Sequence, residues 1–275
     1  MLDKNIKKII SVHGVPRSGT SWLAQIIDSS PNVRYKFQPI FSNSFKDRIN
    51  VRSSKEEIYA FFNELYYYDD EFLDRTIQKR NGIYPVFKNK FDLPDTLLIK
   101  MVRYHYLIPH LLKNTQEILI VGIIRHPCAV LNSWKNAPKE FPPHLNFSEQ
   151  WEFAQDRDEF KPEEYFGFHK WKELAKMFLW LQKKFPEKFY LIRYEQLVKN
   201  TEAVVKDLFN FCGLTITEQT INFIQESRTI HKDDTYSVFK GLINLDAWKT
   251  ELDKRIIDRV YYELKNTELE IFLNY

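Results

Sequence analysis

The chain has 275 residues, enough for a buried core in one large domain or two small ones. Hydrophobic residues make up 44% of the sequence and charged residues 28%, a globular composition that excludes a disordered or fibrous protein. The 40 basic residues exceed the 37 acidic ones by three and are scattered along the chain, which argues against nucleic acid as a partner.

Cysteine content and hydropathy exclude further classes. Cys128 and Cys212 have neither CxxC nor histidine spacing, so the sequence predicts no disulfide framework and no metal site. The longest purely apolar stretch, residues 118–124, is too short to cross a bilayer, and residues 1–8 are polar. We therefore expect a soluble, cytoplasmic protein without a membrane span.

Four short apolar runs predict buried strands, at residues 7–12, 97–102, 117–124 and 188–193. Helical spacing predicts helices over 18–28, from 54 to 65, from 126 to 134, and over 148–160, 165–185, 201–211 and 217–226, with a last one from about 245. Residues 69–96 look irregular, and 135–147 and 231–241 look like loops. The alternation predicts an α/β fold, a parallel sheet flanked by helices in a single domain over 1–275.

Ligands of such sheets bind at the carboxyl ends of the strands. The first predicted strand is followed by Gly14-Val15-Pro16-Arg17-Ser18-Gly19-Thr20-Ser21, with two of the chain's seven glycines. A loop of this kind turns backbone N–H groups inward at a helix N-terminus and cradles an anion. Arg17, with the hydroxyls of Ser18, Thr20 and Ser21, suits a phosphate-type group.

The GxxxxG spacing is similar to the Walker A loop of NTPases, but Thr20 stands where that loop has lysine. The strand at 118–124 also lacks a terminal Asp that could hold magnesium. Both departures disfavour a P-loop kinase or NTPase, which stays as an alternative.

Residues 16–23 resemble the 5'-phosphosulfate loop of the sulfotransferases that use 3'-phosphoadenosine-5'-phosphosulfate (PAPS), whose fold is P-loop-like. Together with Ser30-Pro31-Asn32-Val33, the loop lies close to the version in tyrosylprotein and bacterial sulfotransferases. Arg125-His126-Pro127 with Ser133 is similar to the family's 3'-phosphate site. Weaker resemblances are Arg193-Tyr194-Glu195-Gln196-Leu197, where the family's tyrosine lies near the adenine, and Phe239-Lys240-Gly241 followed by Trp248, which resembles a segment that closes over the 3'-phosphate.

The resemblance implies in-line transfer of a sulfuryl group from PAPS to a hydroxyl or amine of a small molecule or carbohydrate, with 3'-phosphoadenosine-5'-phosphate (PAP) as product and no metal. It implies a donor site made by Pro16, Arg17, Ser18, Gly19, Thr20, Ser21, Trp22, Arg125, Ser133, Tyr194, Lys240 and Gly241. Arg17 would neutralise charge on the leaving phosphate, and Lys100 would assist.

The base that accepts the acceptor's proton is harder to place. Tyrosylprotein enzymes have a glutamate after the loop helix, where this sequence has Gln38. Cytosolic members use a histidine shortly after a lysine on the next strand. Here His105 follows Lys100 at a longer spacing, so we predict His105 as the base. His13, Glu56 and Glu57 stay open as alternatives.

A protein that binds PAP or PAPS without catalysis is a third hypothesis, because Gln38 replaces the expected acid. The acceptor is not identified by any motif. The aromatic-rich segments 59–68 and 165–180 either line its pocket or belong to the core, and their helical spacing favours the core.

Overall fold

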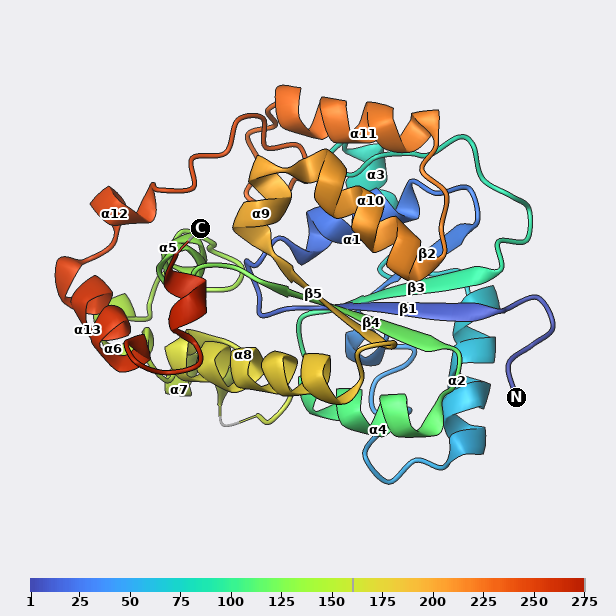
Figure 1. Cartoon of the computed structure of the whole chain (residues 1–275), viewed down its shortest axis with the longest axis horizontal. Coiled ribbons are helices and arrows are strands. Elements are labelled where there is room, and N and C mark those ends of the chain that lie inside the picture. Colours follow the sequence, from blue (N-terminus) through green and yellow to red (C-terminus); the bar gives the residue numbers. More distant parts are fainter. Residues whose placement is uncertain (160, 275) are drawn as a thin grey trace.

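A computed structural model, which describes residues 1–159 and 161–274, has a parallel sheet through its centre (Figure 1). In this described part the sheet has five strands in the order β2-β3-β1-β4-β5, all neighbours parallel. The strands are Lys8–His13 (β1), Val33–Phe37 (β2), Thr96–Met101 (β3), Ile118–Ile124 (β4) and Phe189–Arg193 (β5). The predicted α/β fold with a parallel sheet is confirmed.

Helices cover both faces of the sheet (Figure 1). The α-helices are Thr20–Asp28 (α1), Lys55–Tyr67 (α2), Thr76–Arg80 (α3), Ile108–Asn114 (α4), Pro127–Lys135 (α5), Phe147–Gln150 (α6), Gln155–Asp158 (α7), Gly167–Lys184 (α8), Tyr194–Lys199 (α9), Thr201–Cys212 (α10), Glu218–Thr229 (α11), Trp248–Glu251 (α12) and Lys254–Leu264 (α13). Short 3₁₀ turns span Pro39–Phe41 (η1), His105–Leu107 (η2) and Glu270–Leu273 (η3). No helix among these residues is long and apolar enough to cross a membrane.

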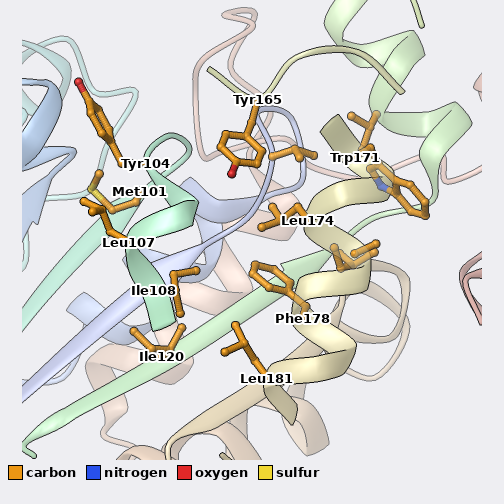
Figure 2. Packing of buried hydrophobic residues seen from close by; sticks show 14 of the residues in the cluster. Met101, Tyr104, Leu107, Ile108, Ile120, Tyr165, Trp171, Leu174, Phe178 and Leu181 are labelled. Atoms are coloured by element: carbon orange, nitrogen blue, oxygen red, sulfur yellow. The ribbon is translucent and has the colours of Figure 1, made fainter. Parts of the chain in front are cut away.

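Each face of the sheet has its own apolar cluster. One cluster joins the sheet to α1, α10 and α11, and the other joins it to α2, α4 and α8. Figure 2 shows part of the second cluster, in which Leu174, Phe178 and Leu181 of α8 lie with Ile108 of α4 and Ile120 of β4. Both faces are buried, which is why the strands read as continuous apolar runs rather than alternating ones.

Strand β2 was missed by the sequence analysis, because it carries Arg34 and Lys36 instead of an apolar run. The structure half-buries Arg34, fully buries Lys36, and gives both side chains hydrogen-bond partners. Arg34 donates to the carbonyl of Tyr66 (3.0 Å), and Lys36 pairs with Asp74 (2.8 Å). Tertiary contacts thus override the strand's charged sequence.

The helix predicted over 148–160 is also different. It divides into the short helices α6 and α7, and its end at Phe160 lies outside the described residues. The N–H groups of Phe168 and His169, at the start of α8, donate to the carbonyls of Trp151 and Glu152 (2.9 and 2.8 Å). Those carbonyls therefore cap another helix instead of continuing their own.

Candidate functional site

A cavity of about 410 Å³ lies at the carboxyl ends of the strands, where the loop between β1 and α1 meets β3, β4 and β5. In the described residues, six basic side chains and one acidic side chain line it. The basic residues are Arg17, Arg75, Lys100, Arg103, Arg125 and Lys240, and the acidic residue is Glu140. A cavity with this excess of positive charge is suited to a ligand with several anionic groups.

The loop after β1 has an unusual backbone. Arg17 and Gly19 both adopt left-handed conformations, with φ of 73° and 87°, and α1 begins at the next residue, Thr20. Gly19 lies against the ring of Tyr194, where an added Cβ would come within 2.5 Å of two ring carbons. Glycine is therefore required at this position by both its conformation and its contact.

Arg17 connects the loop to two other parts of the chain. Its Nε donates to Ser133 Oγ on α5, and its Nη2 donates to the carbonyl of Thr235, both at 3.1 Å. Arg125, which follows β4, donates from Nη1 to the carbonyl of Arg17 (3.1 Å) and lies over the Tyr194 ring at 4.8 Å. The sequence-predicted residues Arg17, Arg125, Ser133 and Tyr194 are thus brought together.

The polar atoms of this group are not all satisfied within the protein. Ser18 Oγ and Arg125 Nε are buried and have no hydrogen-bond partner. Unpaired buried donors of this kind are costly, and they occur where a ligand completes the site. An anion at the loop would give both atoms a partner, so the residues present fit a phosphate-containing ligand.

A second cavity of about 280 Å³ adjoins the first and shares five lining residues with it: Arg17, Arg125, Ser133, Thr235 and Lys240. Trp248 also lines this cavity, whereas Gly241 does not. Lys240 donates from Nζ to the carbonyl of Asp234 (2.7 Å), so the segment after α11 folds over the cavity. We call the surface made by Arg17, Thr20, Arg125, Ser133 and Tyr194 the loop half of the site.

Pro16, Ser21 and Trp22, also predicted from the sequence, line the first cavity beside the loop half. The indole of Trp22 is fixed by a hydrogen bond from Nε1 to Ser227 Oγ on α11 (2.9 Å). Its ring meets the Tyr194 ring edge to face, with centroids 6.5 Å apart. Two aromatic side chains therefore border one wall of the cavity.

The remaining wall comes from the ends of β2 and β3 and from the segment before α3. We call the surface made by Phe37, Gln38, Arg75, Lys100 and Arg103 the β2–β3 half. Lys100 is 4% exposed, and burial lowers its pKa from 10.5 to about 7. An anion bound beside it would restore its charge.

His105, predicted as the base, does not line either cavity. Its ring is fully buried, and it packs edge to face on Tyr165 with centroids 4.5 Å apart. Its Nδ1 lies 3.0 Å from Nδ1 of His13, whose Nε2 lies 2.6 Å from Ser11 Oγ. Burial lowers the pKa of His105 well below its usual value and that of His13 to about 3, so both rings are neutral.

The reason for this correction is the spacing after Lys100. Val102, two residues on, lines the cavity, whereas the chain then turns at Tyr104 (φ 58°) into η2 and directs His105 into the core. The alternatives Glu56 and Glu57 lie exposed at the start of α2, where Ser54 and Glu57 form the predicted capping box. The geometry places none of these groups against the cavity.

Among the lining residues that the sequence analysis missed are Arg75, Tyr84, Arg103 and Glu140. Arg103 is buried and neutralised, since its Nε donates to Glu164 (2.8 Å) and its Nη1 donates to Gln38 Oε1 (3.2 Å). No motif marks these residues, because they lie singly in irregular segments or just past a strand.

Glu140 lies where the two halves meet. Its Oε2 is buried without a hydrogen-bond partner and is 3.8 Å from Nε of Arg17. Its backbone is fixed, because its carbonyl accepts from Trp134 Nε1 (3.2 Å) and Arg157 Nε (2.6 Å). A carboxylate oxygen is thus held beside the cationic centre of the cavity.

Most rings of the aromatic-rich segments belong to the core. Phe61, Phe62, Tyr66, Tyr165 and Phe178 are all buried in the one apolar cluster of which Figure 2 shows a part. No residue of 59–68 or of 165–180 lines either of the two cavities. Across residues 1–159 and 161–274 no group of three His, Cys, Asp or Glu side chains could hold a metal ion.

Known proteins share the fold that carries this site. The model of the sulfotransferase family matches residues 10–218. The fold is similar to mouse sulfotransferase SULT7A1 complexed with PAP (TM-score 0.58, 15% identity, 99% of this chain and 88% of that chain) and to retinol dehydratase in a complex with retinol and PAP (0.56, 14%, 96% and 83%). It is also similar to the sulfotransferase domain of the Synechococcus PCC 7002 olefin synthase (0.54, 15%, 99% and 97%). A search of curated proteins gave no match.

Proposed function

The chain belongs to the sulfotransferase family, and we propose that it transfers a sulfuryl group from PAPS to a hydroxyl or amine of a small-molecule or carbohydrate acceptor. The observation that carries the choice of donor is the meeting of the loop with Arg125 and Ser133 through Arg17. It joins a 5'-phosphosulfate cradle to a 3'-phosphate site within one cavity. The retinol in the retinol dehydratase complex supports a small alcohol as acceptor.

In this proposal the loop half binds the donor. The N–H groups of the loop and the hydroxyls of Ser18, Thr20 and Ser21 bind the 5' end. Arg125, Ser133 and Lys240 bind the 3'-phosphate, for which the unpaired Arg125 Nε supplies a donor. Trp22 and Tyr194 border the wall on which an adenine ring would stack.

PAPS supplies a sulfuryl group that is already attached to a good leaving group, the 5'-phosphate. The bond from sulfur to the bridging phosphate oxygen breaks, its electron pair stays on the phosphate, and a new bond forms from sulfur to the acceptor oxygen or nitrogen. Arg17 and Lys100 neutralise the charge that develops on the phosphate and sulfuryl oxygens.

The acceptor's proton must leave as the new bond forms, and we assign its acceptance to Glu140. Glu140 is the carboxylate that lines the cavity in the described residues, and its Oε2 has no hydrogen-bond partner. Its position 3.8 Å from Nε of Arg17, to which we assign the charge of the transferring group, supports this assignment. Proton acceptance requires contact with the acceptor, which the core position of His105 does not offer.

The test of the donor is calorimetric titration of the purified protein with PAP, with ADP and with ATP plus magnesium. PAP should bind at least about tenfold more tightly than ADP, because ADP lacks the 3'-phosphate that Arg125 and Ser133 hold. Release of PAP from PAPS in the presence of an acceptor panel then measures transfer. A preference for ATP with magnesium would show that the loop binds another nucleotide and would overturn the proposal.

A further inference from the structure

The order of strands divides the cavity between its two ligands. The loop after β1 and the ends of β4 and β5 form the loop half, so a donor bound there leaves the ends of β2 and β3 free. The acceptor must therefore approach the β2–β3 half. Its chemistry can be inferred from the groups that this half presents.

Arg75 is a cation of this half that has no carboxylate partner in the described residues. Its guanidinium carbon lies 4.0 Å from the centroid of the Phe37 ring and 5.3 Å from that of Tyr84. Its Nε is buried and has no hydrogen-bond partner, and no carboxylate of the described residues pairs with it. The neighbouring carboxylate, Asp74, forms an ion pair with Lys36 instead (2.8 Å).

Arg103, in the same half, is a cation whose charge is balanced by groups of the protein. Glu164 and Gln38 occupy its Nε and Nη1, so its charge is balanced inside the protein. Lys100, in contrast, has its Nζ 4.7 Å from the centroid of the Phe37 ring and has no ion-pair partner in residues 1–159 and 161–274. Arg75 and Lys100 thus share one aromatic ring and lack the counter-charge that Arg103 has.

The position of Arg75 is also held at a cost. Arg75 has φ of 57°, a left-handed conformation that is unfavourable for a non-glycine residue. This conformation lies directly before α3 and places the guanidinium over Phe37. A partly buried cation without an anion is unfavourable unless a ligand supplies the missing charge.

We propose, on the basis of the proposed sulfuryl transfer, that the acceptor is an anionic molecule whose carboxylate or phosphate group binds Arg75. Lys100 interacts with the sulfuryl group, and Arg75 binds the anionic group of the acceptor. A guanidinium binds a carboxylate or phosphate through two parallel hydrogen bonds, and the rings of Phe37 and Tyr84 take the apolar or planar part next to it. Uncharged alcohols would leave Arg75 unpaired.

The test is a set of matched acceptor pairs that differ in one charge: 12-hydroxydodecanoate and its methyl ester, 4-(hydroxymethyl)benzoate and its amide, and glucose 6-phosphate and glucose. Release of PAP from PAPS gives kcat and KM. Calorimetry on the PAP-saturated protein measures binding of each compound without turnover. At least one anionic member should exceed its neutral partner by about tenfold or more in kcat/KM and should bind more tightly. The carboxylate and phosphate pairs show which anion is preferred.

Three variants separate Arg75 from the donor site. Arg75→Gln should remove the preference for the anionic member mainly through KM, Arg75→Lys should keep part of it, and the affinity for PAP should not change. Arg80→Gln, which changes an exposed arginine at the end of α3, is the matched control and should change neither.

The outcomes distinguish this inference from the function on which it rests. If the wild-type protein does not bind PAP, the donor assignment fails first. If PAP binds and neutral acceptors are used as well as anionic ones, or no anionic member is used or bound, the inference about the acceptor is wrong. Loss of PAP affinity in Arg75→Gln would place Arg75 in the donor site and would equally overturn it.

Discussion

The loop half and the β2–β3 half of the cavity are built in different ways. The loop half takes most of its groups from consecutive residues, 16–22, and from the ends of β4 and β5. The β2–β3 half takes Arg75 from the residue before α3, and Glu140 reaches its border from the loop after α5. The first half is defined by backbone conformation and the second by single side chains on irregular segments.

The difference corresponds to the two ligands. The donor has the same phosphate groups in every reaction, and backbone N–H groups, a helix N-terminus and arginines on regular elements bind them. The acceptor differs between enzymes, and side chains on loops bind it. These side chains can be substituted without a change of fold. Variants in the loop half and of Lys100, to which we assign the sulfuryl group, should therefore affect every acceptor, whereas variants of Arg75 should depend on the acceptor.

The largest effect is expected for Arg17→Ala. Arg17 neutralises charge in the transition state and also joins the loop to Ser133, so kcat should fall by about 10²- to 10³-fold or more with every acceptor. The measurement is steady-state PAP release with two unrelated acceptors. Arg48→Ala, which removes an exposed ion pair with Glu64, is the control for a surface arginine. A loss confined to one acceptor would break the comparison between the halves.

Glu140→Gln tests the border between the halves. The amide keeps the shape of the side chain but cannot accept the acceptor's proton, so kcat should fall by about 10²-fold while PAP affinity is retained or increased. An acceptor that is already ionised at the assay pH should lose much less. Glu149→Gln, an exposed residue on α6, is the control. Equal losses for both kinds of acceptor would show that Glu140 acts through Arg17 and not as a base.

The same contrast explains how much could be predicted from the sequence. Strands β1, β3 and β4 were predicted because they are buried along nearly their whole length and read as apolar runs, and the half-buried edge strand β5 was predicted from a shorter apolar run. Residues 16–22 could be recognised because the anion cradle needs its residues in sequence. Arg125 and Ser133 could be recognised because a strand end and about two turns of α5 fix their spacing.

The rest depends on contacts that no local pattern encodes. Strand β2 carries lysine and arginine, whose partners Asp74 and Tyr66 lie more than 30 residues away. Arg75 and Glu140 come from segments without periodicity, and only the folded chain places them at the cavity. His105 was predicted at the site from its distance to Lys100, but the turn at Tyr104 directs its ring into the core.

Arg125→Ala and Ser133→Ala sharpen the definition of the loop half. Removing the guanidinium should weaken PAP binding by about 10- to 100-fold, because it removes charge-assisted hydrogen bonds, and removing the hydroxyl should weaken it by about three- to tenfold. Binding of ADP, which has no 3'-phosphate, should change little. Calorimetry with both nucleotides checks this, and a parallel loss of ADP affinity would place the 3'-phosphate elsewhere.

The last expected effect is a pH dependence that originates at Lys100 in the β2–β3 half. Burial lowers the pKa of Lys100 to about 7, so at pH 8 most of the free protein has a neutral amine there. The anionic 5' end of PAPS favours the charged form, which raises this pKa on binding. Binding above pH 7 therefore takes up a proton, and affinity falls by up to about tenfold per pH unit. Calorimetry of PAPS at pH 8, in two buffers with different ionisation enthalpies, measures the uptake.

Lys100→Arg is the matched variant, because its guanidinium stays charged throughout this pH range. It should bind PAPS with no proton uptake and with an affinity that is flat from pH 7 to pH 9. If the variant takes up as many protons as the wild type, the titrating group lies elsewhere, and Lys100 does not contact the donor across the border between the two halves.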